Sequence, residues 1–184
     1  MIVSLVADRR TAGVAEVAHD LAVGLRDRLR VPSMALYVDL IAIRAWSATG
    51  TDLVPQPLPG TMRTALTALR PEQHAVLAFV GTLTEPVLTA FDLSSKVLVL
   101  TDDGVASLRA AQRMCRLLHD VGLPRHRLCA IVLADDPDRS EVLEAARAAL
   151  REHSFVVIPR GQLDPAARRT ACAALAGRVL ASIA

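Results

Sequence analysis

The chain has 184 residues, of which 52% are hydrophobic and 3% aromatic, a composition that excludes an intrinsically disordered protein. The formal net charge of +2 gives no strong attraction to nucleic acid or to an anionic membrane surface. No apolar run approaches the roughly 18 residues of a membrane span. We therefore expect one cytoplasmic domain over residues 1–184, without nucleic-acid binding or stable membrane insertion.

Six short β-rich runs alternate with helical patterns along the chain. The runs comprise residues 2–6, 34–40, 75–80, 96–101, 128–133 and 155–158. Most of them are apolar on both faces, which is typical of parallel strands covered by helices on both sides. The sequence therefore predicts an α/β fold with three layers, in which a doubly wound, mostly parallel sheet has right-handed crossovers.

The first strand leads into a polar turn and then into a helix with apolar residues at Val14, Val17, Leu21 and Leu25. This strand, turn and helix form the frame of a phosphate-binding loop. A working loop also needs several glycines, a lysine for the outer phosphates and a hydroxyl for magnesium. Only Gly13 meets these requirements, and the only lysine of the chain is Lys96.

The stretch at residues 44–59 contains the residues that break regular structure, including WSATGTD and PQPLPG. It predicts an irregular surface connection, followed by a short helix at residues 61–69.

Three helices are predicted in the second half of the chain. Residues 105–121 place Leu108, Cys115, Leu118 and Val121 on one face and Arg109, Arg113 and Arg116 on another, and Gly122 ends the helix. Ser140 is expected to cap the next helix. Asp164 is the expected cap of the last helix, with Pro165 at its first position and an apolar stripe at Leu175, Val179, Leu180 and Ile183.

Acidic residues follow two strands at the carboxyl edge of the predicted sheet, where open α/β sheets build sites. Asp102 and Asp103 could bind a cation or an arginine of a partner, but we favour capping of the following helix. Asp135, Asp136 and Asp138 lack the glycine and terminal glutamate of a calcium loop, and a solvated turn is favoured.

Cysteines and histidines suggest neither a metal site nor a catalytic site. The three cysteines, Cys115, Cys129 and Cys172, lie in apolar segments without metal-ligand spacing, so buried reduced thiols are expected. The five histidines are scattered, and no nucleophile elbow accompanies them. A receiver domain is a poor match, because Asp39 follows the second strand and not the third.

The order of these segments resembles the MinD/ParA branch of P-loop ATPases, most of all the pilus-assembly CpaE/TadZ-like members. The best match is residues 92–133, DLSSKVLVLTDDGVASLRAAQRMCRLLHDVGLPRHRLCAIVL. The first strand and helix, YVDL at residues 37–40 and VVIP at residues 156–159 extend the resemblance. It implies a P-loop NTPase-like fold.

The resemblance also implies where the nucleotide site would lie. The family's loop places its signature lysine at Arg9, its glycines at Arg10, Thr11 and Gly13, its phosphate lysine at Val14 and its hydroxyls at Ala15 and Glu16. A valine cannot neutralise a triphosphate, an alanine cannot ligate magnesium, and Glu16 repels phosphate. Arg9 and Arg10 could bind an anion with nearby amides, although an exposed turn is favoured.

Three further positions depart from the family's pattern. Asp39 is retained, but the second acidic position falls on Ile41, the magnesium-linked aspartate on Phe79 and the adenine-binding asparagine on Ala134. The segment between the second and third strands is also shorter than in typical members of the family.

Together these departures predict a non-hydrolysing pseudo-ATPase with no catalytic, cofactor-binding or metal-binding residues. We expect a scaffold, localisation or regulatory protein, in a bacterial pilus or secretion apparatus, with a protein partner, a paralogous ATPase or a second copy bound. The alternative is an atypical ATPase that holds ATP and magnesium through Arg9, Arg10, backbone amides and Asp39. A third hypothesis is DNA binding of the partitioning type through Arg109, Arg113 and Arg116, for which a solvated face is preferred.

Overall fold

The computed structural model describes residues 1–8, 11, 13–30, 33–38, 43–47, 53–54, 66–67, 74–81, 83–151, 153–161 and 164–182. Within residues 33–54 it describes the strands by their backbone. Among the sequence-predicted residues, Arg9, Arg10, Asp39, Ile41 and Ile183 lie outside the described part of the chain.

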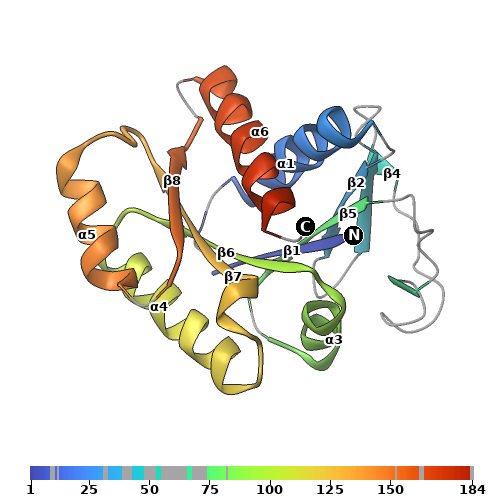
Figure 1. The fold of residues 1–184 in the computed structure, drawn as a ribbon, viewed down its shortest axis with the longest axis horizontal. Helices are drawn as coiled ribbons and strands as arrows, with labels where there is room; N and C mark the ends of the chain where they lie inside the picture. Colours follow the sequence, from blue (N-terminus) through green and yellow to red (C-terminus); the bar gives the residue numbers. More distant parts are fainter. Residues whose placement is uncertain are drawn as a thin grey trace.

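Strands and helices alternate through most of the described chain (Figure 1). The strands are β1 (Ile2–Ala7), β2 (Ser33–Val38), β3 (Ile43–Ser47), β4 (Leu53–Val54), β5 (His74–Val80), β6 (Lys96–Asp102), β7 (Leu128–Ala134) and β8 (Phe155–Pro159). The helices are α1 (Val14–Leu29), α3 (Glu85–Leu93), α4 (Val105–Asp120), α5 (Ser140–Leu150) and α6 (Pro165–Ala181), with a short 3-10 turn η1 (Arg125–Arg127).

The strands form one sheet in the order β4-β3-β2-β5-β1-β6-β7-β8. The six strands from β2 to β8 in that order are parallel, whereas β3 and β4 are antiparallel. Each of the six predicted runs corresponds to one of the parallel strands, so the α/β prediction is confirmed.

The predicted irregular connection at residues 44–59 is wrong in part, because β3 overlaps this region and β4 lies within it. An antiparallel strand needs only a short connection from its neighbour, and β2 at the edge offers it unpaired backbone groups. The Ser, Thr, Gly and Pro clusters concealed this pairing. Of the predicted helix at residues 61–69, the structure describes only residues 66 and 67, which are helical.

Helices cover both faces of the sheet (Figure 1). On one face α1 and α6 pack over a cluster that includes Leu5, Val14, Leu21, Leu98 and Cys172. On the other face α3, α4 and α5 pack over a second cluster, which includes Val6, Phe79, Val99 and Leu118. Alternate residues of β1, β5, β6, β7 and β8 enter opposite clusters, as the period of two in a strand requires.

The two helices on the first face approach each other closely. A Cβ atom added at Gly24 of α1 would lie 3.0 Å from the Cα atom of Ala173 in α6. A buried ion pair also joins them, because the Nε of Arg168 donates to the Oδ2 of Asp20 at 2.7 Å and the Asp20 side chain is only 5% exposed. Neither feature was predicted from the sequence.

The helix ends test three sequence predictions. The Oδ1 of Asp164 accepts from the amides of Ala166 and Ala167 at 2.9 and 3.0 Å, so the predicted cap of α6 is confirmed. The Ser140 prediction is wrong, since Ser140 is already inside α5 and Arg139 occupies the cap position. Gly122, with φ of 102°, ends α4 as predicted, but Val121 is 57% exposed and lies outside the apolar face.

No helix in the described ranges is long and apolar enough to cross a membrane.

Candidate functional site

The turn that follows β1 connects the centre of the sheet to α1. The amide of Thr11 donates to the carbonyl of Asp8 at 3.0 Å, and Gly13 has the left-handed φ of 81° at the cap position of α1. The cap has no side-chain hydrogen bond. A glycine suits this backbone because it has no Cβ atom.

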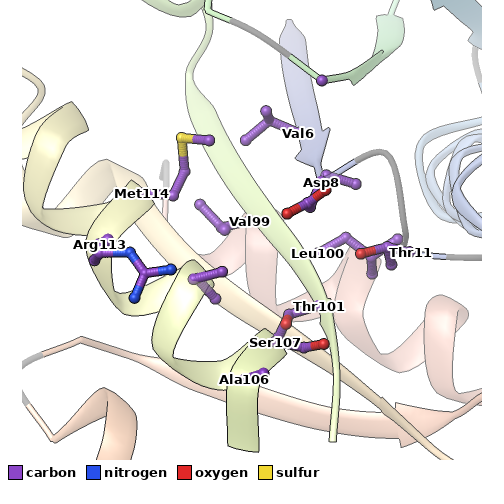
Figure 2. Close-up of a pocket in the computed structure, with 14 residues that line it drawn as sticks. Val6, Asp8, Thr11, Val99, Leu100, Thr101, Ala106, Ser107, Arg113 and Met114 are labelled. Atoms are coloured by element: carbon purple, nitrogen blue, oxygen red, sulfur yellow. The ribbon is translucent and has the colours of Figure 1, made fainter. Parts of the chain in front are cut away.

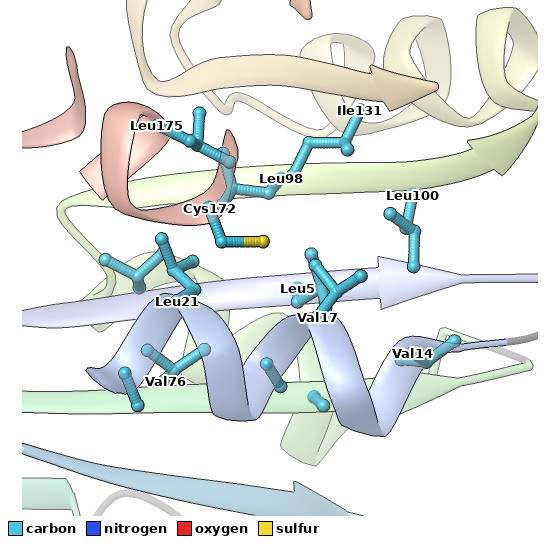
Figure 3. Packing of buried hydrophobic residues seen from close by; sticks show 14 of the residues in the cluster. Leu5, Val14, Val17, Leu21, Val76, Leu98, Leu100, Ile131, Cys172 and Leu175 are labelled. Atoms are coloured by element: carbon cyan, nitrogen blue, oxygen red, sulfur yellow. The ribbon is translucent and has the colours of Figure 1, made fainter. Parts of the chain in front are cut away.

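The Val14 side chain lies in the core and not at the sheet edge. It is 5% exposed and belongs to the cluster under α1, where Figure 3 shows it at the first turn of the helix. The neighbouring Ala15 is half-buried, and Glu16 is exposed. Val14 therefore anchors α1 to the sheet by apolar burial, at the position where the resemblance places the phosphate lysine.

Phe79 and Ala134 are also core residues. Phe79, which is 2% exposed, makes an edge-to-face contact with Phe91 of α3, with 5.6 Å between ring centroids. Ala134 is fully buried at the end of β7, and its carbonyl accepts from the amide of Arg160 at 2.8 Å. Neither side chain offers an oxygen for magnesium or a group for adenine.

Lys96 stands at the opposite edge of the sheet. It begins β6, and its Nζ donates to the carbonyl of His126 at 2.6 Å and to the Oγ of Ser182 at 3.1 Å. Asp102 lies six positions further along the strand, a distance of about 20 Å at about 3.3 Å per residue. The only lysine of the sequence therefore cannot reach the turn after β1.

Arg160 gathers the acidic residues of the carboxyl edge. Its Nη1 lies 2.5 Å from Asp102, its Nη2 lies 3.1 Å from Asp103, and its Nε lies 3.1 Å from Asp135. The Nη2 also reaches the carbonyl of Leu133 at 3.4 Å. The guanidinium thus joins the ends of β6, β7 and β8.

The charges of this cluster balance one another only in part. Burial alone lowers the pKa of Arg160, but the carboxylates of Asp102, Asp135 and Asp103 outweigh it and raise the pKa above its ordinary value. The predicted capping role of Asp102 and Asp103 is wrong, since Gly104 is the cap of α4 and receives no side-chain bond. The other two ligands considered for Asp102 and Asp103 were a cation and an arginine of a partner. The structure shows an arginine, Arg160, which belongs to the same chain.

Other sequence candidates do not assemble into a site. No group of three or more His, Cys, Asp or Glu side chains in the described ranges has the geometry to hold a metal ion. The Oδ1 of Asp136 accepts from the amide of Asp138 at 3.3 Å, as in a solvated turn. All three cysteines are buried free thiols, as predicted. Arg109, Arg113 and Arg116 are exposed on α4.

The structure also reveals a cavity that the sequence did not predict. It lies between the end of β1, the end of β6 and α4 (Figure 2). The chain leaves β1 towards β2 over one face of the sheet and leaves β6 towards β7 over the other face. These adjacent strands therefore form a topological switch point, the place where open α/β sheets bind ligands.

Arg160 is the charged residue at this edge that sequence reasoning missed. The signal was available, because Arg160 directly follows the last strand, and the rule that placed Asp102 and Asp103 at the carboxyl edge also places Arg160 there. The pairing itself could not be read from the sequence, because it depends on the order of the strands in the sheet, in which only β7 lies between β6 and β8.

No family model matches the sequence, and no curated protein matches it. Solved structures do match. The MinD cell division protein of Aquifex aeolicus has a TM-score of 0.70 at 12% identity, covering 98% of this chain and 96% of that one. MinD of Pyrococcus horikoshii, complexed with Mg-ADP, has a TM-score of 0.68 at 17% identity, covering 100% and 98%. A ParA family ATPase from Chlorobium tepidum has a TM-score of 0.63 at 12% identity, covering 95% and 96%. The fold is therefore that of the MinD/ParA P-loop ATPases.

Proposed function

We propose that this protein is a non-hydrolysing member of the MinD/ParA fold that acts through protein contacts, as a scaffold, localisation or regulatory factor. One observation carries the proposal. Val14, Phe79 and Ala134, at three positions where the resemblance places chemistry of the nucleotide site, are buried in the core and carry no polar side-chain atom. Nucleotide binding would need side chains that the described residues at these positions do not offer.

The electrostatics of the edge support the same proposal. The carboxylates that could face a metal ion, Asp102, Asp103 and Asp135, already share Arg160. The guanidinium donates to all three carboxylates and offsets part of their negative charge. Magnesium therefore has no vacant set of ligands there, and a triphosphate would meet the acidic side chains without its counterion.

Thermal denaturation with and without Mg-ATP or Mg-ADP tests the proposal. We expect no shift at millimolar nucleotide and no release of phosphate. A nucleotide at a hundred times its dissociation constant would stabilise the protein by about 2.7 kcal/mol. The Pyrococcus horikoshii MinD, whose structure holds Mg-ADP, is the positive control.

A shift with nucleotide would overturn the proposal and favour the atypical ATPase. In that case Arg9→Gln with Arg10→Gln should abolish the shift, because the alternative assigns phosphate binding to these two side chains. A shift that survives both substitutions would contradict that alternative as well.

A protein partner is the expected ligand of this scaffold. The Aquifex MinD forms a complex with MinC, which shows that a protein of this fold can bind another protein. For this chain we propose a paralogous ATPase, another assembly protein or a second copy. Sedimentation equilibrium with and without Mg-ATP should give the same mass, whereas a nucleotide-dependent dimer would contradict the proposal.

The proposed pathway is assembly of a pilus or a secretion apparatus. It rests on the likeness of residues 92–133 to the CpaE/TadZ-like proteins. Deletion of the gene should reduce or misplace surface pili or stop secretion, and complementation should restore them. A division or chromosome-partitioning defect with normal pili and secretion would contradict this assignment.

A further inference from the structure

The cavity at the switch point has the size and position of a small-molecule site. Its volume is about 520 Å³, within the range of known ligand sites. It is separate from the Arg160 cluster, since neither Arg160 nor its three carboxylate partners lines it. Val14 does not line it either.

The walls of the cavity are mostly apolar. Val6 and Val99 enter from β1 and β6 and belong to the cluster under α4, and the half-buried Met114 closes one side from α4 (Figure 2). Thr11 and Ser107 add hydroxyl groups, and neither forms a side-chain hydrogen bond with another described residue. An apolar body with a few polar groups fits such walls.

The charge of the lining selects the ligand. Arg113 and Asp8 lie on opposite sides of the cavity in Figure 2, and their formal charges cancel. The Arg113 side chain is exposed and forms no ion pair with any residue in the described ranges, so its guanidinium is available to an anion. Among the described lining residues, one guanidinium that is available to an anion suits a monoanion, and the carboxylate on the opposite side disfavours a highly charged phosphate compound.

We propose that this cavity binds an amphipathic monocarboxylate. The carboxylate pairs with the guanidinium of Arg113, because arginine donates two parallel hydrogen bonds to a carboxylate. The apolar body of the ligand lies between Val99 and Met114, where it leaves water.

Titration calorimetry with three probes of equal length tests the proposal. Octanoate should bind with one site per chain, octanol should bind about tenfold more weakly without the ion pair, and octylammonium should not bind. Equal affinities for octanoate and octanol would overturn the role of the charge. No binding of octanoate would overturn the site.

Two matched arginine variants place the carboxylate. Arg113→Gln should weaken octanoate binding about tenfold and leave octanol unchanged. Arg109→Gln should bind both probes as the unaltered protein does, since Arg109 is exposed on the same helix but does not line the cavity. Equal losses in the two variants would overturn the assignment.

A third variant places the apolar body. Ala110 lines the cavity, and Ala110→Phe should fill it and remove binding of octanoate and octanol together. Unchanged binding would place the ligand elsewhere. If the Ala110→Phe variant does not fold, the binding measurements on Arg113→Gln and Arg109→Gln still test the proposal. The Mg-ATP experiment is independent of these titrations, so the failure of either proposal leaves the other standing.

Discussion

The guanidinium of Arg160 lies 2.5 Å from the carboxylate of Asp102, although the two residues are 58 positions apart in the chain. Their side chains are 17% and 18% exposed, so water screens the pair only in part. This contact bridges over β7 from β8 to β6. It decides what the carboxyl edge of the sheet presents to a ligand.

Arg160→Gln should lower the free energy of unfolding by about 2 kcal/mol, because partly buried carboxylates lose a charged hydrogen-bond donor. Urea denaturation of this variant, Asp102→Asn and the double variant measures the coupling between the two side chains. Arg139→Gln is the control, since Arg139 pairs with Glu141 where both side chains are largely exposed. Equal losses in the Arg160 and Arg139 variants would contradict a structural role for the cluster.

Arg160→Ala should not create a response to divalent cations. Asp102, Asp103 and Asp135 share one guanidinium, but no group of three or more such side chains in the described part of the chain has the geometry to hold a metal ion. Thermal denaturation of the variant with and without millimolar calcium should therefore give the same midpoint. Stabilisation of the variant alone by calcium would contradict this expectation.

Val14→Lys should destabilise the protein and fail to restore nucleotide binding. The side chain at this position lies in the core beneath α1, so an ammonium group there loses its hydration. We expect a loss of at least about 2 kcal/mol by urea denaturation. Glu16→Lys, exposed in the same turn, should cost less than about 1 kcal/mol. A stable Val14→Lys protein that binds Mg-ATP would refute this account of the turn.

Gly24→Val should separate α1 from α6. The added Cβ atom would lie 3.0 Å from the Cα of Ala173 and 3.3 Å from the Cβ of Ala176, and backbone cannot yield as a side chain does. Overpacking of this kind costs about 1–3 kcal/mol. Ala148→Val, on the exposed surface of α5, is the control and should change stability by less than about 0.5 kcal/mol. Similar effects of both variants would show that the helix contact tolerates the extra atoms.

Stability should fall as the pH rises from 9 towards 12. Burial raises the pKa of Cys115 and Cys172 from 9.0 to about 12. Between these values the unfolded chain releases the thiol protons and the folded chain keeps them, so unfolding becomes easier. The chain has one lysine and one tyrosine, which limits other contributions in this range. Cys172→Ala should reduce the slope of unfolding free energy against pH, and an unchanged slope would contradict this assignment.

The sequence by itself determined the layers and the six parallel strands. Runs that are apolar on both faces must be covered on both sides, and this requirement acts locally along each strand. The cap of α6 at Asp164 and the end of α4 at Gly122 were predictable for the same reason, since both depend on neighbouring residues. The positions in the turn after β1 came from the resemblance, and their loss of nucleotide chemistry stays a prediction.

Only the tertiary structure decided which side chains meet at the carboxyl edge and between the helices. Asp20 and Arg168 are 148 positions apart, and Asp135 and Arg160 are 25 apart. A local pattern shows that such residues are polar but not which partner they find, so Asp102 and Asp103 suggested a helix cap. The antiparallel pairing of β3 and the cavity beside α4 also arise from strand order and packing. Contacts of this kind depend on how distant segments are placed together, which no single stretch of sequence encodes.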